Sequence, residues 1–148
     1  MNTRTYLPMI AVILGATLPA AADQAEKISL NRLSPVEKAA GWKLLFDGKT
    51  TDSWRGYRSE KFPEKGWAIE DGCLRVVAGG QGGDIITTDQ YKDFELVLEW
   101  KVSPKANSGI MYRVTEKHKA PWQTGPEYQI LDDEGWGVAP TDSHSAGG

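Results

Sequence analysis

Two segments near the end of the chain carry ionic and amide side chains at every second position between apolar neighbours. They are residues 108–114, which include Arg113, and residues 127–132. Side chains of a strand alternate between its two faces, so Glu127 and Gln129 should point to the same face. We expect Arg113, on a neighbouring strand, to share that face. A carboxylate, an amide and a guanidinium together could orient the hydroxyls of a sugar or of another small polar ligand.

The chain has two histidines, and they differ in their surroundings. His118 lies in a run of charged residues and is expected to be a solvated loop residue. His144 follows a carboxylate-rich stretch and is a candidate base or metal ligand, although spacing alone favours an exposed side chain there. No G-x-S-x-G motif is present, so a Ser/His/Asp hydrolase is poorly supported. Residues 132–135 lack the spacing of an EF-hand calcium loop.

A glycine-rich loop, residues 79–83, directly precedes Asp84. The loop lacks the spacing of a phosphate-binding P-loop and no helical pattern follows it. We therefore interpret its glycines as allowing a tight turn or a close approach of the backbone. Asp84 is then either a turn cap or a carboxylate of the site. Trp122 and Trp136 lie in loop-like sequence and are candidate platforms on which a sugar ring could stack.

Charge and the N-terminal sequence restrict the class of protein. The 20 Asp and Glu residues outnumber the 17 Lys and Arg residues, and no basic cluster is present, so nucleic acid is not an expected partner. Residues 1–22 have the pattern of a secretory signal peptide, with Arg4 before an apolar run and three alanines at its end. The apolar run is shorter than the roughly 20 residues that span a bilayer. We expect a protein without a stable membrane anchor, exported to the periplasm or secreted.

The remaining sequence favours β structure after a short lead-in. Residues 23–40 are expected to form a lead-in with a short helix, because Ser34, Pro35 and Glu37 give an N-cap, a first helical proline and a capping box. From Trp42 onward, short β-type runs alternate with Gly, Asp and Pro. The turn at residues 71–72 predicts a hairpin, and residues 94–102, with an apolar side chain at every second position, are the clearest expected strand.

No helical period of ten or more residues follows the lead-in, which excludes a parallel α/β fold and leaves an antiparallel sandwich or barrel. The single Cys73 cannot form an intrachain disulfide, so an exported chain must be held by its core. The last residues are loop-like and contain no closing strand. We therefore expect residues 41–148 to be the N-terminal part of a larger domain, an apparently truncated fold.

Six sequence blocks, taken together and in order, resemble the 3-keto-disaccharide hydrolase family. They are GWKLLFDG (41–48), WAIEDG (67–72), GGDI (82–85), FEL with EW (94–96 and 99–100), NSGI with Arg113 (107–110) and EYQILD (127–132). HSAG at 144–147 resembles the start of a later block of the family. The resemblance implies an all-β, antiparallel β-sandwich of the concanavalin A-like jelly-roll type. It also implies an exported enzyme whose partner is a carbohydrate, an oxidised disaccharide or glycoside.

The chemistry implied by the resemblance begins with a ketone at C3 of a sugar. The ketone acidifies the hydrogen at C2, so a base can remove that proton and the glycosidic oxygen can leave, after which water adds. Glu127 or His144 would be the base, and Arg113 or a divalent metal held by Glu127 and His144 would stabilise the enolate oxygen. The residues expected to bind the sugar are Asp84, Gln129, Asp132 and Trp122.

Two other functions remain open. A glycosidase with two catalytic carboxylates is ranked lower because the chain has no E-x-D-x-x-E strand motif. A lectin-like carbohydrate-binding module would use the same polar face and the tryptophan platforms without a base. Only the first function predicts cleavage that is selective for the ketone over its unoxidised parent.

Overall fold

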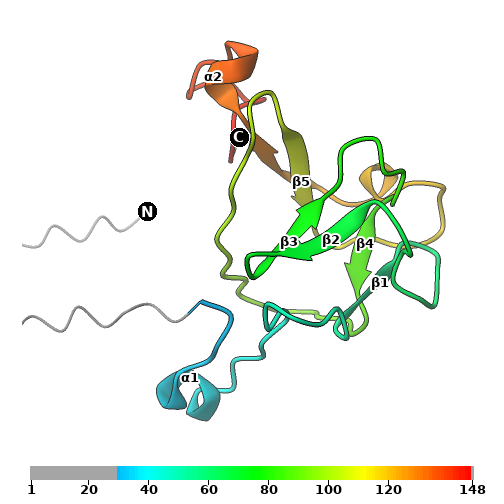
Figure 1. Ribbon diagram of the computed structural model, residues 1–148, viewed down its shortest axis with the longest axis vertical. Coiled ribbons are helices and arrows are strands. Elements are labelled where there is room, and N and C mark those ends of the chain that lie inside the picture. The colour runs from blue at the N-terminus through cyan, green and yellow to red at the C-terminus, as the bar shows by residue number, and fades with distance from the viewer. Residues whose placement is uncertain (1–29, 148) are drawn as a thin grey trace, which may run out of the picture.

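A computed structural model of the chain describes residues 30–147 (Figure 1). The expected signal peptide therefore lies outside the described residues. The elements in chain order are α1 (Pro35–Ala39), β1 (Trp54–Gly56), β2 (Trp67–Glu70), β3 (Cys73–Val76), β4 (Ile85–Thr87), β5 (Asn107–Met111), the 3-10 helix η1 (Pro121–Gln123), β6 (Glu127–Leu131) and α2 (Asp133–Trp136). The strands pair antiparallel and the helices are few and short, which confirms the all-β class. None of the helices in the described part of the chain is long and apolar enough to cross a membrane.

The short helix α1 forms where its capping residues predict it. The Ser34 hydroxyl accepts a hydrogen bond from the Glu37 backbone N–H at 3.2 Å, and the Glu37 carboxylate accepts one from the Ser34 N–H at 2.7 Å. The bond from the Ser34 backbone N–H to the carboxylate, followed by the interaction with the Ser34 hydroxyl, lowers the pKa of Glu37. Gly41, with a φ of +86°, follows the end of the helix. Every residue of α1 is exposed, so the helix contributes no side chain to a core.

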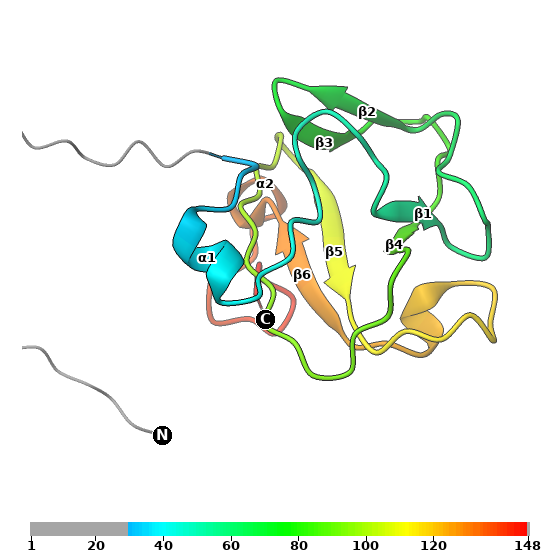
Figure 2. The same cartoon turned by 90° about the horizontal axis from the view of Figure 1, so that it is seen from below.

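Three separate antiparallel ladders make up the β structure, namely β1–β4, β2–β3 and β5–β6. The β2–β3 hairpin turns at Asp71 and Gly72, whose φ angles of 51° and 72° are both positive, as an Asp-Gly hairpin turn requires. In Figure 2, β5 and β6 lie side by side and the other two ladders lie to one side of them. Two-stranded ladders do not form a closed two-sheet sandwich within residues 30–147, so the jelly roll stays a prediction.

Residues 94–102 do not form the strand that their alternation predicts. Within the described chain no neighbouring backbone pairs with this segment, and alternation of side chains cannot replace the ladder hydrogen bonds that define a strand. Its apolar face stays in contact with solvent, with Phe94 at 49%, Leu96 at 43% and Trp100 at 45% exposure. Among the described residues, the buried apolar side chains are Leu131, at 6% exposure, and Pro121.

The glycine-rich loop packs its backbone directly against the start of β2. A Cβ at Gly66 would overlap the backbone of Gly82, and one at Gly82 would lie 2.6 Å from the Lys65 carbonyl oxygen. The indole N–H of Trp67 donates to the Gly83 carbonyl at 3.0 Å. Only glycine allows this approach, which agrees with the interpretation of the loop as a close backbone contact.

Candidate functional site

The β5–β6 ladder places Glu127 and Gln129 on one face, as strand alternation predicts. Gln129 lies opposite Gly109 and Glu127 lies opposite Met111. A Cβ at Gly109 would overlap the Glu127 carboxylate, so the glycine lets that carboxylate lie across β5. The side-chain oxygen of Gln129 is buried and has no hydrogen-bond partner among the described residues. A buried acceptor without a partner is costly in a folded protein and often marks a functional position.

Arg113 does not extend the strand, and the expectation that it does is wrong. β5 ends at Met111, and Arg113 has a φ of +55°, in the left-handed region that turns the chain out of the ladder. Face alternation therefore does not assign its side chain to the face of Glu127. Its guanidinium is exposed and makes no hydrogen bond or ion pair within residues 30–147. Its proposed part in the chemistry stays a prediction.

His144 is held by a carboxylate two residues earlier. Its Nδ1 lies 2.8 Å from Oδ1 of Asp142, and the same oxygen accepts the backbone N–H of His144 at 2.8 Å. These bonds, the backbone bond first, lower the pKa of the Asp142 carboxyl. With Nδ1–H directed at the carboxylate, the lone pair of the imidazole lies on Nε2. The side chain is 84% exposed, so Nε2 is open to a substrate.

The turn that carries His144 is anchored on both sides. The Ser145 hydroxyl is buried and donates to the Asp142 carbonyl at 2.7 Å. The backbone N–H of Ala146 donates to the Asp133 carboxylate at 2.9 Å, and that of Gly147 donates to the Gln129 carbonyl at 2.9 Å. The turn therefore lies beside the outer edge of β6, the strand that carries Glu127.

Two of the expected sugar-binding residues have different environments. The Asp132 carboxylate accepts the backbone N–H of Lys105 at 2.6 Å, so one of its oxygens has a structural partner. Trp122, in η1, is 67% exposed and its ring is available for stacking. The binding role of each stays a prediction.

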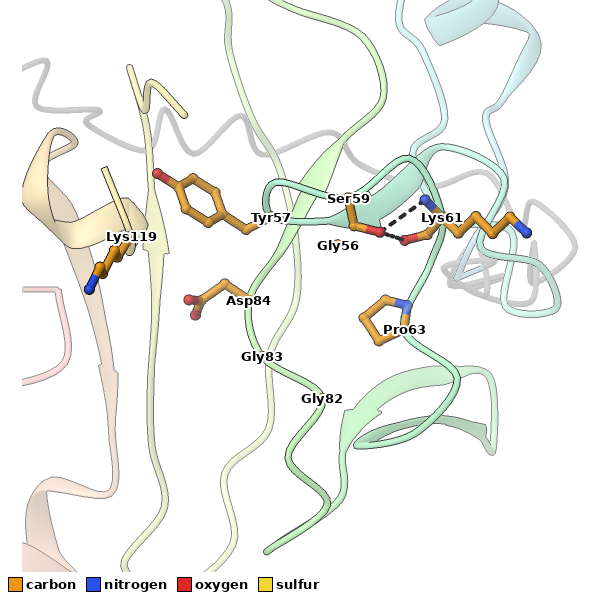
Figure 3. Close-up of a pocket in the computed structure, with 9 residues that line it drawn as sticks. All are labelled: Gly56, Tyr57, Ser59, Lys61, Pro63, Gly82, Gly83, Asp84 and Lys119. Atoms are coloured by element: carbon orange, nitrogen blue, oxygen red, sulfur yellow. Dashed lines mark hydrogen bonds between the residues drawn. The ribbon is translucent and has the colours of Figure 1, made fainter. Parts of the chain in front are cut away.

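Asp84 lines a hollow of about 360 Å³ at the end of the β1–β4 ladder (Figure 3). Within the described chain no hydrogen bond or ion pair joins Asp84 to Glu127 or to His144. Asp84 is thus among the residues that line the hollow, whereas Glu127, Gln129 and His144 are not.

An ion pair between Arg55 and Glu116, called the clasp from here on, lies beside the hollow and is not predicted by the sequence. The two terminal nitrogens of the Arg55 guanidinium, Nη1 and Nη2, donate to the two oxygens of Glu116 at 2.8 Å, and the Arg58 backbone N–H adds a third bond at 2.6 Å. Pairing with Arg55, followed by the Arg58 bond, lowers the pKa of Glu116 to about 2. The Tyr57 hydroxyl shares its proton between the carbonyls of Thr115 (2.9 Å) and His118 (3.0 Å). No local spacing signals an ion pair between partners 61 positions apart.

The described residues do not fit a metal centre of the usual kind. Catalytic zinc sites use three protein ligands, and the part of the chain that the structure describes holds no group of three His, Cys, Asp or Glu side chains placed to share an ion. Glu127 and His144 would supply two ligating side chains.

The fold and the site define the class of protein. It is an antiparallel all-β protein with a polar face on one ladder and an exposed histidine held by a carboxylate. Residues 41–148 match the model of the 3-keto-alpha-glucoside-1,2-lyase-like domain, and the chain belongs to that family. It is 43% identical over 117 residues to the 3-keto-disaccharide hydrolase of Bacteroides thetaiotaomicron, a match that covers 68% of this chain and 40% of that protein.

A solved structure is also similar to this chain. The chain is similar to the crystal structure of a candidate glycosyl hydrolase from Parabacteroides distasonis, with 36% identity and a TM-score of 0.55. The match covers 70% of this chain and 46% of that one. The chain therefore spans less than half the length of either relative.

Proposed function

We propose that this chain takes part in cleaving 3-keto-glycosides, by removal of the proton next to the ketone. Its family and the name of its Bacteroides relative support this substrate class. The observation that carries the proposal is the bond between His144 and Asp142, with Nδ1 and Oδ1 2.8 Å apart. A base of this type needs a fixed tautomer and an accessible nitrogen, and the pair has both.

In the proposed reaction Nε2 of His144 removes the proton at C2 of the 3-keto sugar. The electrons of the C–H bond form an enolate whose charge lies on the C3 oxygen. When the enolate collapses, a C1–C2 double bond forms and the glycosidic oxygen leaves C1, taking the proton from Nε2 of the imidazolium and so regenerating the base. Water then adds across that double bond, so the net result is hydrolysis. Asp142 stabilises the imidazolium that forms after the first step.

The β5–β6 face supplies groups for the rest of the sugar. The Glu127 carboxylate lies across Gly109 at the strand surface and can accept hydrogen bonds from hydroxyls. Gln129 has a buried side-chain oxygen that finds no partner within residues 30–147 and that a ligand hydroxyl would satisfy. Arg113, exposed beyond β5, is the proposed cation for the enolate oxygen. The proposed location of the protein is the periplasm or the outside of the cell, where it would encounter glycosides.

The test compares two histidine variants on two substrates. His144→Asn should lower the cleavage rate of a 3-keto-glucoside by about 10²- to 10⁴-fold, because it removes the base. His118→Asn is the matched control, since its side chain makes no hydrogen bond or ion pair among the described residues, and it should keep the rate. The unoxidised parent glucoside should not be cleaved by any version. Equal rates for His144→Asn and wild type would refute the role of His144.

Glu127 gives an independent measurement. Glu127→Gln should raise KM and leave kcat within a few-fold if Glu127 binds hydroxyls. A loss of kcat in Glu127→Gln, with His144→Asn active, would instead make Glu127 the base. Binding of both glucosides without cleavage of either would support the carbohydrate-binding module, for which the exposed Trp122 is the relevant feature. Cleavage of the unoxidised parent would support the two-carboxylate glycosidase.

A further inference from the structure

We infer that residues 94–102 are an interface between two copies of this chain. In this interface the segment pairs antiparallel with the same segment of a second copy, about a two-fold axis at Leu98. The inference is independent of the proposed reaction, because none of these residues has a part in the proposed chemistry. It rests on three features of the segment, namely exposed apolar side chains, a backbone without ladder partners, and an order of charges that is complementary to itself.

The segment exposes a continuous row of apolar side chains. Every residue from 91 to 101 is exposed, so no described element covers either face of the segment there. In Figure 1 the trace between β4 and β5 runs along one side of the molecule. Large exposed apolar patches mark places where another molecule binds. The large apolar side chains of the segment, each at least 42% exposed, are Phe94, Leu96, Val97, Leu98 and Trp100.

The backbone of the segment is also free to pair. None of the β ladders includes residues 94–102, and within residues 30–147 no backbone hydrogen bond begins or ends in them. None of these residues lies in a helix or has a positive φ, so no turn interrupts the segment. Unpaired N–H and C=O groups of an extended chain are a template for a strand of another molecule. One added strand would satisfy these groups and shield the apolar row.

The order of the side chains favours a second copy as the partner. Residues directly opposite each other in an antiparallel pair share a face of the sheet. With Leu98 opposite the partner subunit's Leu98, Leu96 lies opposite the partner subunit's Trp100. On the other face, Glu95 lies opposite the partner subunit's Lys101. Because the two-fold axis repeats each contact, the interface gains two pairs of opposite charge.

Neighbouring registers are disfavoured by the same charges. A shift of the pairing by two residues in one direction sets Glu95 opposite the partner subunit's Glu99. The same shift in the other direction sets Glu99 opposite the partner subunit's Glu99. Like charges directly opposite each other are destabilising. A shift by one residue sets charged side chains against the apolar row. The register centred on Leu98 avoids both conflicts.

The experiment is analytical ultracentrifugation of the full chain over a roughly hundredfold range of concentration. One strand pair is a small interface, so wild type should pass from monomer to dimer as the concentration rises. Glu95→Lys and Lys101→Glu each set like charges opposite each other at both symmetry-related positions. Each should weaken dimerisation about tenfold or more, and the variant that carries both changes should regain wild-type association. Glu64→Lys is the matched control, since it changes the net charge as Glu95→Lys does, and it should associate as wild type does.

Amide hydrogen exchange at residues 94–102 shows what covers the segment. Protection that rises with protein concentration in wild type, and that is lost in Glu95→Lys, would support the pairing. Protection that does not depend on concentration would show that a segment of the same molecule covers the row, and would overturn the inference. The exchange of β5 and β6 amides reports whether each variant is folded.

Two further results would overturn the inference. They are a wild-type monomer at every concentration, and a double charge variant that associates no better than the single variants. Because association is measured without a substrate, failure of the proposed reaction leaves this result unaffected. Conversely, cleavage of a 3-keto-glucoside by a protein that stays monomeric would support the reaction and refute the interface.

Discussion

Replacing Glu116 by Gln removes the negative charge of the Arg55–Glu116 pair while keeping the size of the side chain. In the native protein, Arg55 bonds both Glu116 oxygens at 2.8 Å and the Arg58 N–H bonds one of them at 2.6 Å. An amide can accept only through its single oxygen and cannot form the paired bonds to the guanidinium. We therefore expect Glu116→Gln to weaken the connection between β1 and the loop that carries Glu116.

The pKa of Glu116 sets the size and the pH dependence of this effect. The difference between the native pKa of about 2 and the ordinary value of 4.5 corresponds to about 3 kcal/mol of unfolding free energy before solvent screening is taken into account. The side chain is 35% exposed, so solvent screening reduces the expected loss of unfolding free energy to about 1 kcal/mol. A carboxyl with a lowered native pKa stabilises the fold above pH 4.5, and that contribution is lost as the pH falls through 2.

Urea unfolding of wild type and Glu116→Gln at pH 7, 4 and 2.5 measures both features. The difference in unfolding free energy should be about 1 kcal/mol at pH 7 and should shrink toward zero at the lowest pH. Glu64→Gln is the control, because that exposed carboxylate has no hydrogen bond or ion pair in the described part of the chain. A difference that is absent at pH 7, or that grows as the pH falls, would refute the reasoning.

Three further substitutions test other parts of the fold by urea unfolding or amide exchange. Leu131→Ala should lower the unfolding free energy by about 2–5 kcal/mol, because Leu131 is a buried apolar side chain, and a loss below 1 kcal/mol would contradict that burial. Gly82→Ala should cost about 1–3 kcal/mol through its clash with the Lys65 carbonyl, and wild-type stability would contradict the close packing. Ser34→Ala should lose amide protection at Glu37 with little change in global stability, since α1 is exposed throughout, whereas a large global loss would show that α1 packs on the fold.

Features whose cause is local could be predicted from the sequence. The Ser34 capping box and the hairpin turn at Asp71 and Gly72 depend on neighbouring residues alone, and the structure shows both. The shared face of Glu127 and Gln129 follows from strand alternation and is also present. These features need no knowledge of what lies elsewhere in the chain.

Features that depend on a distant partner could not be predicted. Residues 94–102 alternate well, yet a strand needs a neighbouring backbone, and the pattern carries no information about where that neighbour is. The alternation of β5 does not extend to Arg113, because the strand ends at Met111 and Arg113 itself has a φ of +55°. The Arg55–Glu116 clasp joins residues that are 61 positions apart, with no spacing rule that links them.

That long separation also affects the order in which the protein folds. Closing a loop of about 60 residues costs conformational entropy before the Arg55–Glu116 contact contributes anything, so we expect the contact to form after the β2–β3 hairpin, whose paired residues are close in sequence. An interaction formed late is absent from the transition state. Glu116→Gln should therefore speed unfolding and leave the refolding rate nearly unchanged. The hollow would then be among the last parts of the molecule to form and among the first to open.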